Sequence, residues 1–319
     1  MVNQTWTLSK MRMRLAVRSR TFLFFSMAMP VGFLFGYIIF FGRGNVAIIP
    51  YLLGAVLTVT VMGAFWGLSM QLVMFREQGI LRRFHLAPIG PGAMLASSII
   101  SNYFLVFPTV ILEFLICRFV FHMPTWGNLL AVFFLVSIGA VAFSAMGLIV
   151  ASVTNDMQET TVINNIIWSL FLFLSGATIP LAFMPGWVQK VTLFLPATYL
   201  ATGLEGAMLH AAGGREVIED IVALAVSLIL AFVISCQLFR WEPEEKIRGK
   251  AKLWATAALI PFLLLGSWEV LRGHRLQEIR NDFQMMQQHS MPVRSSVAPN
   301  VSAAPASHPE KATATHPPE

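Results

Sequence analysis

Long apolar stretches, separated by short polar segments, run through most of the chain before residue 240. A helix of roughly 20 residues crosses the hydrocarbon core of a bilayer, which is about 30 Å thick. The pattern therefore predicts six membrane spans, which lie near residues 21–41, 47–74, 95–119, 128–153, 162–183 and 218–239. A shorter apolar run at 253–271 predicts a seventh span, which Pro261 would kink. The first run is too long for the apolar part of a signal peptide, so we expect an uncleaved span.

The composition supports membrane insertion. Hydrophobic residues make up 56% of the 319 residues, charged residues make up 12%, and the mean hydropathy is +0.68. A single soluble core cannot bury so much apolar side chain, so the chain is predicted to be an all-α polytopic membrane protein. Cys117 and Cys236 fall inside predicted spans and far apart in the sequence, which indicates neither a disulfide framework nor a metal site.

Basic residues mark alternate polar segments of the chain. Lysines and arginines of short loops stay on the cytoplasmic side of a membrane, so their positions predict the orientation. One set of segments holds Lys10, Arg12, Arg14, Arg18, Arg20, Arg76, Arg82, Arg83, Arg240, Lys246, Arg248, Lys250 and Lys252. The opposite short segments hold Arg43, Arg118, Lys190 and Arg215. We expect a cytoplasmic N-terminus in a bacterial inner membrane. We attribute the net charge of +6 to contact with anionic lipid, so no nucleic-acid partner is indicated.

A charged loop, FREQGILRRFHLAPIGPGAML, separates the second and third predicted spans. Its segment Glu77–Phe84 can form a short amphipathic helix, with Ile80 and Leu81 on the apolar side, before Pro88 and the following glycines break it. Two interpretations stay open from the loop alone. The helix could dock into a groove of a cytoplasmic partner, or the loop could be an interfacial turn whose arginines fix the orientation.

Two longer motifs resemble one known family. The segment REQGILRRFHLAPIGPGAMLASSII is similar to a loop of the ATP-binding-cassette (ABC) type-2 export permeases, where a Glu-x-Gly-x-Leu-Arg-Arg pattern leads into a proline turn. Downstream, the segment ASVTNDMQETTVINNIIWSLFLFLSGATIPLAFMPGWVQKVTLFLPATYLATGLEGAM resembles the fourth-to-sixth-span region of that family. The motifs stand in the family's order, and with the six spans they cover residues 10–241.

The resemblance implies a coupling role for the charged loop. In this family the loop is a helix that contacts an ATPase subunit, and the residues that match it here are Glu77, Gly79, Leu81, Arg82 and Arg83. The chain has no phosphate-binding Gly-x-x-x-x-Gly-Lys-Ser/Thr loop. ATP and its Mg²⁺ are therefore expected on a separate ABC ATPase subunit, with no cofactor bound by this chain. The family also implies a homodimer, or pairing with a related permease, around the transport path.

The N-terminal segment, residues 1–20, predicts a helix along the membrane surface. Leu8, Met11 and Leu15 recur at helical spacing, with basic residues between them. The resembling family has a helix at this place along the inner leaflet. A plain basic anchor for the first span is the alternative.

The segment between residues 175 and 217 is rich in proline and glycine but stays apolar. Trp187 and Val191 begin one helical stripe, and Leu200, Leu204 and Met208 form a second. The family resemblance implies two re-entrant helices that cap the outer end of the path. The candidate residues of this outer gate are Pro180, Pro185, Trp187, Pro196, Tyr199 and Glu205. The alternative is an amphipathic hairpin at the interface, anchored by Trp187 and a tyrosine, Tyr199.

Three polar residues inside predicted spans are candidates for the path or for packing, namely Glu113, Asn164 and Asn165. A carboxylate in lipid is costly, so Glu113 either pairs with a polar neighbour such as Arg118 or lines a path. The asparagines either bond between helices or line the path. Small residues in the fourth span predict close helix packing within the chain, and they are Gly139, Ala140, Ser144, Gly147 and Ala151.

Catalytic signals are missing from the sequence. The histidines are scattered, without metal-ligand spacing inside a span, and no serine elbow occurs. We therefore expect a non-catalytic permease that exports a hydrophobic or amphipathic substrate, such as a drug, natural product, lipid or glycan. The alternatives are an ion-coupled secondary transporter, for which Glu113 is the supporting residue, and a membrane-embedded lipid-modifying enzyme.

The expected organisation has four parts. Residues 1–20 form the cytoplasmic interfacial helix, 21–241 the six-span permease domain, 242–271 a cytoplasmic linker with the seventh span, and 272–319 a short helix and a disordered tail. The disorder is predicted from a composition of proline, alanine, serine and threonine, which cannot build a core. The sequence identifies neither the substrate nor the function of the tail.

Overall fold

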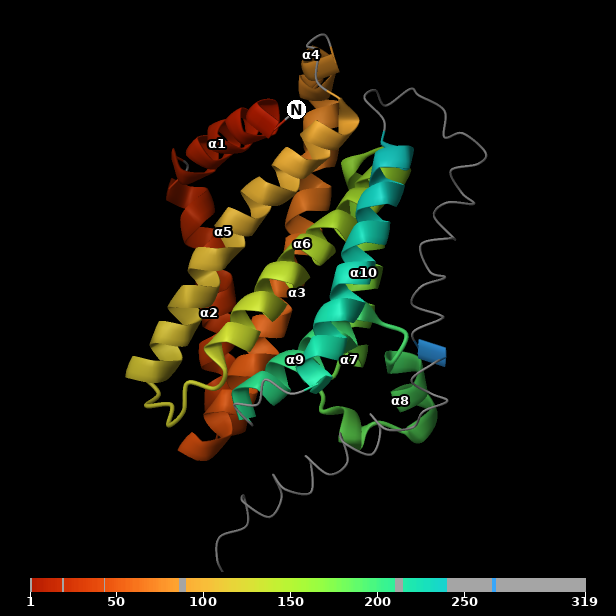
Figure 1. The fold of residues 1–319 in the computed structure, drawn as a ribbon. Helices are drawn as coiled ribbons and strands as arrows, with labels where there is room; N and C mark the ends of the chain where they lie inside the picture. Colours follow the sequence, from red (N-terminus) through yellow and green to blue (C-terminus); the bar gives the residue numbers. More distant parts are fainter. Residues whose placement is uncertain are drawn as a thin grey trace, which may run out of the picture.

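The computed structural model describes residues 2–18, 20–42, 44–85, 90–209, 215–239 and 266–267. Within these ranges the chain forms helices and no strand (Figure 1), so the predicted all-α class is confirmed. The α-helices are α1 (Val2–Arg18), α2 (Arg20–Gly42), α3 (Ile49–Glu77), α4 (Ile80–His85), α5 (Pro91–Phe119), α6 (Leu129–Val153), α7 (Met157–Leu174), α8 (Gly186–Thr192), α9 (Pro196–Leu209) and α10 (Arg215–Leu238). Two short 3-10 helices are η1 (Val46–Ile48) and η2 (Leu181–Phe183).

Among the described residues, four helical segments are long and apolar enough to cross a membrane. They are Val46–Glu77, Pro91–Phe119, Leu129–Val153 and Val217–Leu238. The apolar part of α2, Ser26–Gly42, is shorter. Apolar runs of this kind form helices because lipid offers no partner to backbone N–H and C=O groups, which an α-helix pairs within itself. The chain is a multi-pass membrane protein.

The fifth predicted span, residues 162–183, has different bounds in the structure. Helix α7 begins at Met157, because the side chain of Asp156 caps it by accepting a backbone hydrogen bond (2.7 Å). It ends at Leu174, and a turn at Ser175 leads towards η2. The apolar run alone did not reveal this turn, because the residues that follow it are as apolar as the helix.

The division into four parts stays a prediction. Of the predicted seventh span, residues 253–271, the structure describes residues 266–267, which are helical. The rest of that span, the preceding linker from residue 242 and the tail at 272–319 lie outside the described residues. The predicted first span, residues 21–41, coincides with α2.

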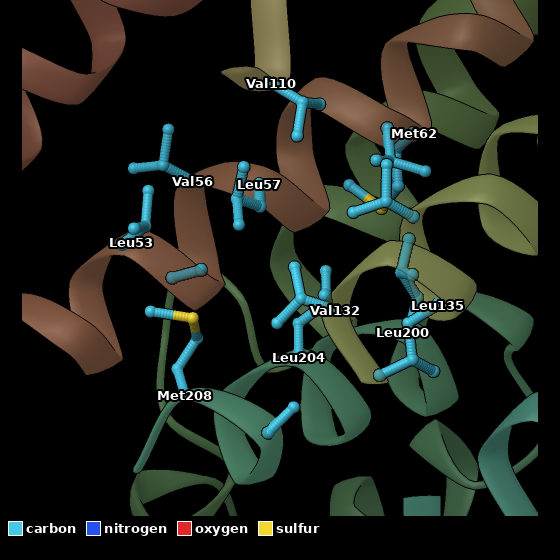
Figure 2. Packing of buried hydrophobic residues seen from close by; sticks show 14 of the residues in the cluster. Leu53, Val56, Leu57, Met62, Val110, Val132, Leu135, Leu200, Leu204 and Met208 are labelled. Atoms are coloured by element: carbon cyan, nitrogen blue, oxygen red, sulfur yellow. The ribbon is translucent and has the colours of Figure 1, made fainter. Parts of the chain in front are cut away.

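Helix α3 lies at the centre of the bundle (Figure 1). It packs against α2, α5, α6, α7 and α9, while α10 packs against α6 and α9. A helix that is apolar on all sides is stable when other elements surround it, which explains the central place of α3. Side chains from these helices meet in one apolar cluster (Figure 2), which includes Leu53, Val56, Leu57, Met62, Val110, Val132, Leu135, Leu200, Leu204 and Met208.

The two helices predicted after residue 175 are present as α8 and α9. On α9, the side chains of Leu200, Leu204 and Met208 are fully buried, as their spacing predicts. On α8, Trp187 is 71% exposed and Val191 also faces outward. The second stripe therefore faces the core, because α9 packs against α3, α6 and α10, and the first stripe faces the surroundings.

Gly147 allows α6 to approach α3, since a Cβ built on it would collide with the carbonyl oxygen of Phe65. We expect Gly147→Ala to destabilise the detergent-solubilised protein by about 1–3 kcal/mol, as overpacking does. The control is Gly63→Ala on α3, because nothing lies within 4 Å of its Cβ position. Alanine there should stabilise the helix by up to about 1 kcal/mol. Equal melting temperatures for Gly147→Ala and the wild type would contradict this account of the packing.

Candidate functional site at the α3–α4 turn

The charged loop of the sequence forms a sharp turn between α3 and α4. Helix α3 continues through Glu77, and Gly79 has a φ of +67°, in the left-handed region that glycine adopts readily. Helix α4 then begins at Ile80. The prediction of one short helix over Glu77–Phe84 is therefore wrong at its start, because Glu77 belongs to the last turn of α3. Figure 1 shows α4 at one end of the bundle, continuing from the end of α3.

Arg76 closes the C-terminal end of α6. Its side chain is 1% exposed, and it donates from Nη2 to the carbonyl oxygen of Ala151 (2.6 Å) and from Nη1 to that of Thr154 (2.9 Å). The last carbonyl groups of a helix have no partner within the helix and carry partial negative charge, so a guanidinium stabilises them. The end of α3 is thus bound to the end of α6.

Glu77 closes the N-terminal end of α7 from the next position along the chain. Its Oε1 accepts a hydrogen bond from Met157 N (2.8 Å), in the first turn of α7. A carboxylate is favourable there because the first N–H groups of a helix are unpaired within it and carry partial positive charge. Two adjacent residues of opposite charge therefore hold the two helix ends that meet at the turn of residues 154–156.

From the sequence, Arg76 indicates only the orientation, and Glu77 is expected to contact a partner. The sequence signal for this capping was the adjacent pair of opposite charges, Arg76 and Glu77, at the end of a long apolar run. An arginine suits the C-terminal end of a helix, and a glutamate suits the N-terminal end of another. The sequence does not show that the end of α6 and the start of α7 lie beside this pair, because that depends on how the helices pack in the bundle. The structure therefore adds a link between α3 and the α6–α7 turn that the motif did not reveal.

The other predicted contact residues divide between core and surface. Leu81 is 0% exposed and packs in an apolar cluster with residues of α3 and α5, among them Leu72 and Met94. Arg82 is exposed. The side chain of Arg83 lies outside the described residues. Leu81 thus anchors α4 to the bundle, and Arg82 lies where a partner can reach it.

Helix α1 reaches the same region through a buried cation. Arg12 donates a hydrogen bond to Ser98 Oγ on α5 and lies 5.3 Å from the ring centroid of Phe75 on α3. Burial lowers the pKa of Arg12 to about 10, so the guanidinium stays charged at neutral pH. Leu8 is buried and Met11 is 53% exposed, so the predicted apolar stripe of α1 is divided between the bundle and the surroundings.

The candidate residues of the outer gate lie at the starts of η2, α8 and α9 or on α8 and α9 themselves. Pro180 immediately precedes η2, Pro185 immediately precedes α8, and Pro196 is the first residue of α9. Proline suits the start of a helix because the N–H group that it lacks would have no partner within the helix there. Tyr199 is buried and donates from Oη to the carbonyl oxygen of Leu193 (2.8 Å). This bond joins α9 to the end of α8, so the two short helices form one unit.

Trp187 and Glu205 lie on different helices of that unit. Trp187 is exposed on α8, whereas Glu205 is half-buried on α9 beside Tyr51 of α3. Helices α3 and α9 approach closely at this level, since a Cβ on Gly54 would lie 3.2 Å from the backbone of Glu205. Trp187 fits the exposed interface anchor that the alternative interpretation requires. Tyr199 does not, because its side chain is inside the bundle.

Glu113 is enclosed between α5 and α3. It is 0% exposed, and its Oε1 accepts a hydrogen bond from Thr60 Oγ1 (2.6 Å), while its Oε2 has no hydrogen-bond partner among the described residues. Glu113 therefore pairs with a polar neighbour, but this neighbour is Thr60 and not Arg118. Arg118 donates to the carbonyl oxygen of Met123 and lies 5.1 Å from the ring of Trp126. Positions 113 and 118 lie on different faces of a helix, which separates the two charges.

The two asparagines predicted for the path or for packing differ in burial. Asn164 is buried and donates from Nδ2 to Ser69 Oγ (2.6 Å), which joins α7 to α3, whereas Asn165 is exposed. Asn102 is not among the residues predicted from the sequence, yet it donates from Nδ2 to Ser144 Oγ (2.8 Å) and joins α5 to α6. In the ranges that the structure describes, no three His, Cys, Asp or Glu residues gather as a metal site.

Comparison with known proteins gives concordant matches. A family model described as "ABC-2 type transporter" matches residues 3–209. The chain is 26% identical over 188 residues to "Probable multidrug ABC transporter permease YbhS" of Escherichia coli K12, a match that covers 59% of this chain and 47% of that protein. It is 27% identical over 148 residues to "Putative transport permease ycf38" of Cyanophora paradoxa, covering 45% and 50%. The chain spans about half the length of these curated relatives.

Replacing Arg76 tests the link between α3 and α6. We expect Arg76→Met to lower thermal stability, because it leaves the carbonyl groups of Ala151 and Thr154 without their donor at a cost of about 1–3 kcal/mol each. The control is Arg82→Met, an exposed arginine of α4 that should change stability by less than about 1 kcal/mol. Melting temperatures in the same detergent compare the variants, and equal losses would show that Arg76 has no special role.

Proposed function

This chain belongs to the ABC-2 type transporter family, and we propose that it is the transmembrane permease subunit of an ATP-driven exporter. It is a transport permease and carries out no catalysis itself. In this proposal a separate ABC ATPase subunit binds ATP and Mg²⁺, which agrees with the absence of a phosphate-binding loop from the sequence. Closure of the ATPase subunits on ATP pushes on α4, and the spans respond by changing access to the transport path.

The link made by Arg76 and Glu77 is the observation that carries the proposal. Force applied to α4 acts on α3 through the short turn at Gly79 and through the buried side chain of Leu81. The hydrogen bonds of Arg76 and Glu77 pass the same displacement to the end of α6 and the start of α7. Four helices therefore share one mechanical input, which a loosely attached loop could not give them.

The predicted contact residues take different roles in this mechanism. Arg82 is exposed on α4 and is the proposed contact with the ATPase subunit, with Arg83 as its neighbour in the motif. Leu81 fixes α4 on the bundle, and Gly79 permits the turn. Glu77 acts inside the permease in this proposal, because its carboxylate binds the start of α7.

The assembly around this chain follows from the family. We propose a homodimer, or pairing with a related permease, that encloses a path between two copies of the bundle in the membrane. The proposed cytoplasmic end carries α1 and α4, and α8 and α9 then form the outer gate with Glu205 and Tyr199. In this proposed orientation the N-terminus lies on the cytoplasmic side of a bacterial inner membrane. Glu113 and Asn164 serve packing between helices, since both are buried against α3.

The proposed cargo is hydrophobic or amphipathic, and it leaves the cytoplasm or the inner leaflet. One relative is named as a multidrug permease, a description that belongs to that protein. Drugs, natural products, lipids and glycans are the cargo classes that fit the proposal.

Charge reversal on α4 tests the ATPase contact. We expect Arg82→Glu to weaken co-purification of a Walker-motif ATPase from native membranes by about tenfold, since like charges at a docking surface repel. Lys190→Glu is the matched control, because Lys190 is an exposed cation of α8, at the other end of the bundle in Figure 1. It should leave the yield of ATPase unchanged. Melting temperatures confirm that both variants are folded.

The same experiment separates the proposal from its main alternative. If the wild-type protein captures no ATPase in conditions that preserve other membrane complexes, an ion-coupled transporter becomes the better interpretation. Glu113 is then the residue to replace first, because its Oε2 is buried without a hydrogen-bond partner among the described residues. If ATPase is captured equally by both variants, the permease function stands and the contact lies elsewhere.

A further inference from the structure

Helix α1 has a fixed rotation about its own axis. Ser9 Oγ donates to the carbonyl oxygen of Ser97 (3.2 Å), and Ser101 Oγ donates to that of Ser9 (3.4 Å). Arg12, one turn further on, donates to Ser98 Oγ. These bonds hold one polar face of α1 against α5 and determine which residues face away from the bundle.

The opposite face of α1 forms a cationic hollow. Its volume is about 310 Å³, and its lining consists of Thr7, Lys10, Met11, Arg14 and Arg18. All five side chains are exposed. The three cations recur at every fourth position, so they stand one above the other along one side of the helix. The hollow therefore offers several N–H donors and one hydroxyl to a single ligand.

No carboxylate of the N-terminal region balances these cations. The sequence contains no aspartate or glutamate before Glu77. A further cation of α1, the buried Arg12, is turned towards α5 and Phe75 and adds to the positive charge. We therefore expect an anion as the ligand of this hollow, and phosphate is an anion that arginine and lysine bind through charge-assisted hydrogen bonds.

We propose that this hollow binds the phosphate of an anionic phospholipid. Helix α1 leads directly into α2, an apolar helix of the membrane bundle, and Figure 1 shows α1 on the flank of the bundle while α4 occupies its tip. The cations adjoin exposed apolar side chains, Met11 in the hollow and Trp6 beside it. Tryptophan and mixed cationic and apolar surfaces are typical of the interface between lipid headgroups and acyl chains. Free inorganic phosphate would leave Met11 and Trp6 in water, whereas the acyl chains of a phospholipid can cover them.

The proposal rests on the membrane location of the chain and not on ATP-driven export. Its test uses the purified full-length chain in a neutral detergent. Dioleoyl phosphatidylglycerol is added at increasing concentration, and the rise in melting temperature is compared with the rise given by dioleoyl phosphatidylcholine and by inorganic phosphate. A ligand that binds the folded protein raises its melting temperature with concentration.

The test variant is the double change Lys10→Gln and Arg14→Gln. We expect phosphatidylglycerol to raise the melting temperature of the wild type, and the rise to fall below about half in this variant. The control, Lys190→Gln, removes an exposed cation of α8 and should keep the full rise. Phosphatidylcholine and inorganic phosphate should have little effect on any of the proteins.

Three results would overturn the proposal. An undiminished response of the α1 variant to phosphatidylglycerol would place the lipid elsewhere. An equal response of the wild type to inorganic phosphate would make the hollow a site for a free anion. Loss of a co-purifying ATPase from the α1 variant, with its lipid response intact, would make this face a protein contact.

A second measurement covers the case in which the α1 variant is poorly folded. The wild-type protein is labelled with a photoactivatable phosphatidylglycerol whose reactive group is near the headgroup, and the adducts are mapped by peptide mass spectrometry. We expect adducts on residues 6–18, reduced by an excess of unlabelled phosphatidylglycerol and not by phosphatidylcholine. Adducts confined to other segments would contradict the proposal.

Discussion

The burial of α3 along most of its length is the constraint on which the rest of the structure depends. An apolar helix without a polar face has to be surrounded, and α2, α5, α6, α7 and α9 supply the surroundings. The few polar groups of α3 find partners on those helices, Thr60 with Glu113 and Ser69 with Asn164. Such bonds specify which helix lies on which side, a role that apolar contact alone performs poorly.

The ends of α3 connect this central position to the proposed function. At one end the helix carries Arg76, Glu77 and the turn into α4, and Arg12 of α1 packs over Phe75 in the same region. The helix proposed to contact lipid and the helix proposed to contact an ATPase therefore meet the same segment of α3. At the other end, η1 leads into α3 and α9 crosses close to Gly54. A displacement at one end has a packed and continuous route to the other.

Much of the fold could be predicted because it depends on local patterns. Run length located α2, α3, α5, α6 and α10, and the spacing of Leu200, Leu204 and Met208 identified the buried face of α9. The end of α7 could not be predicted in this way, since the residues on both sides of Ser175 are apolar. The hydrogen bonds between helices depend on how the helices pack in three dimensions. The spacing of positions 113 and 118 already separates Glu113 from Arg118, but the bond to Thr60 depends on α3 lying beside α5, a fact that no spacing within α5 contains.

The caps supplied by Arg76 and Glu77 also bear on how the chain is made. Synthesis is vectorial, so α3 leaves the ribosome before α6 and α7. The two charged side chains are thus already present when the carbonyl groups that end α6 and the N–H groups that begin α7 emerge. Those groups have no partner within their own helices. The partners of the end of α6 and the start of α7 are therefore synthesised before these helices. This part of the bundle can be assembled in the order of its translation.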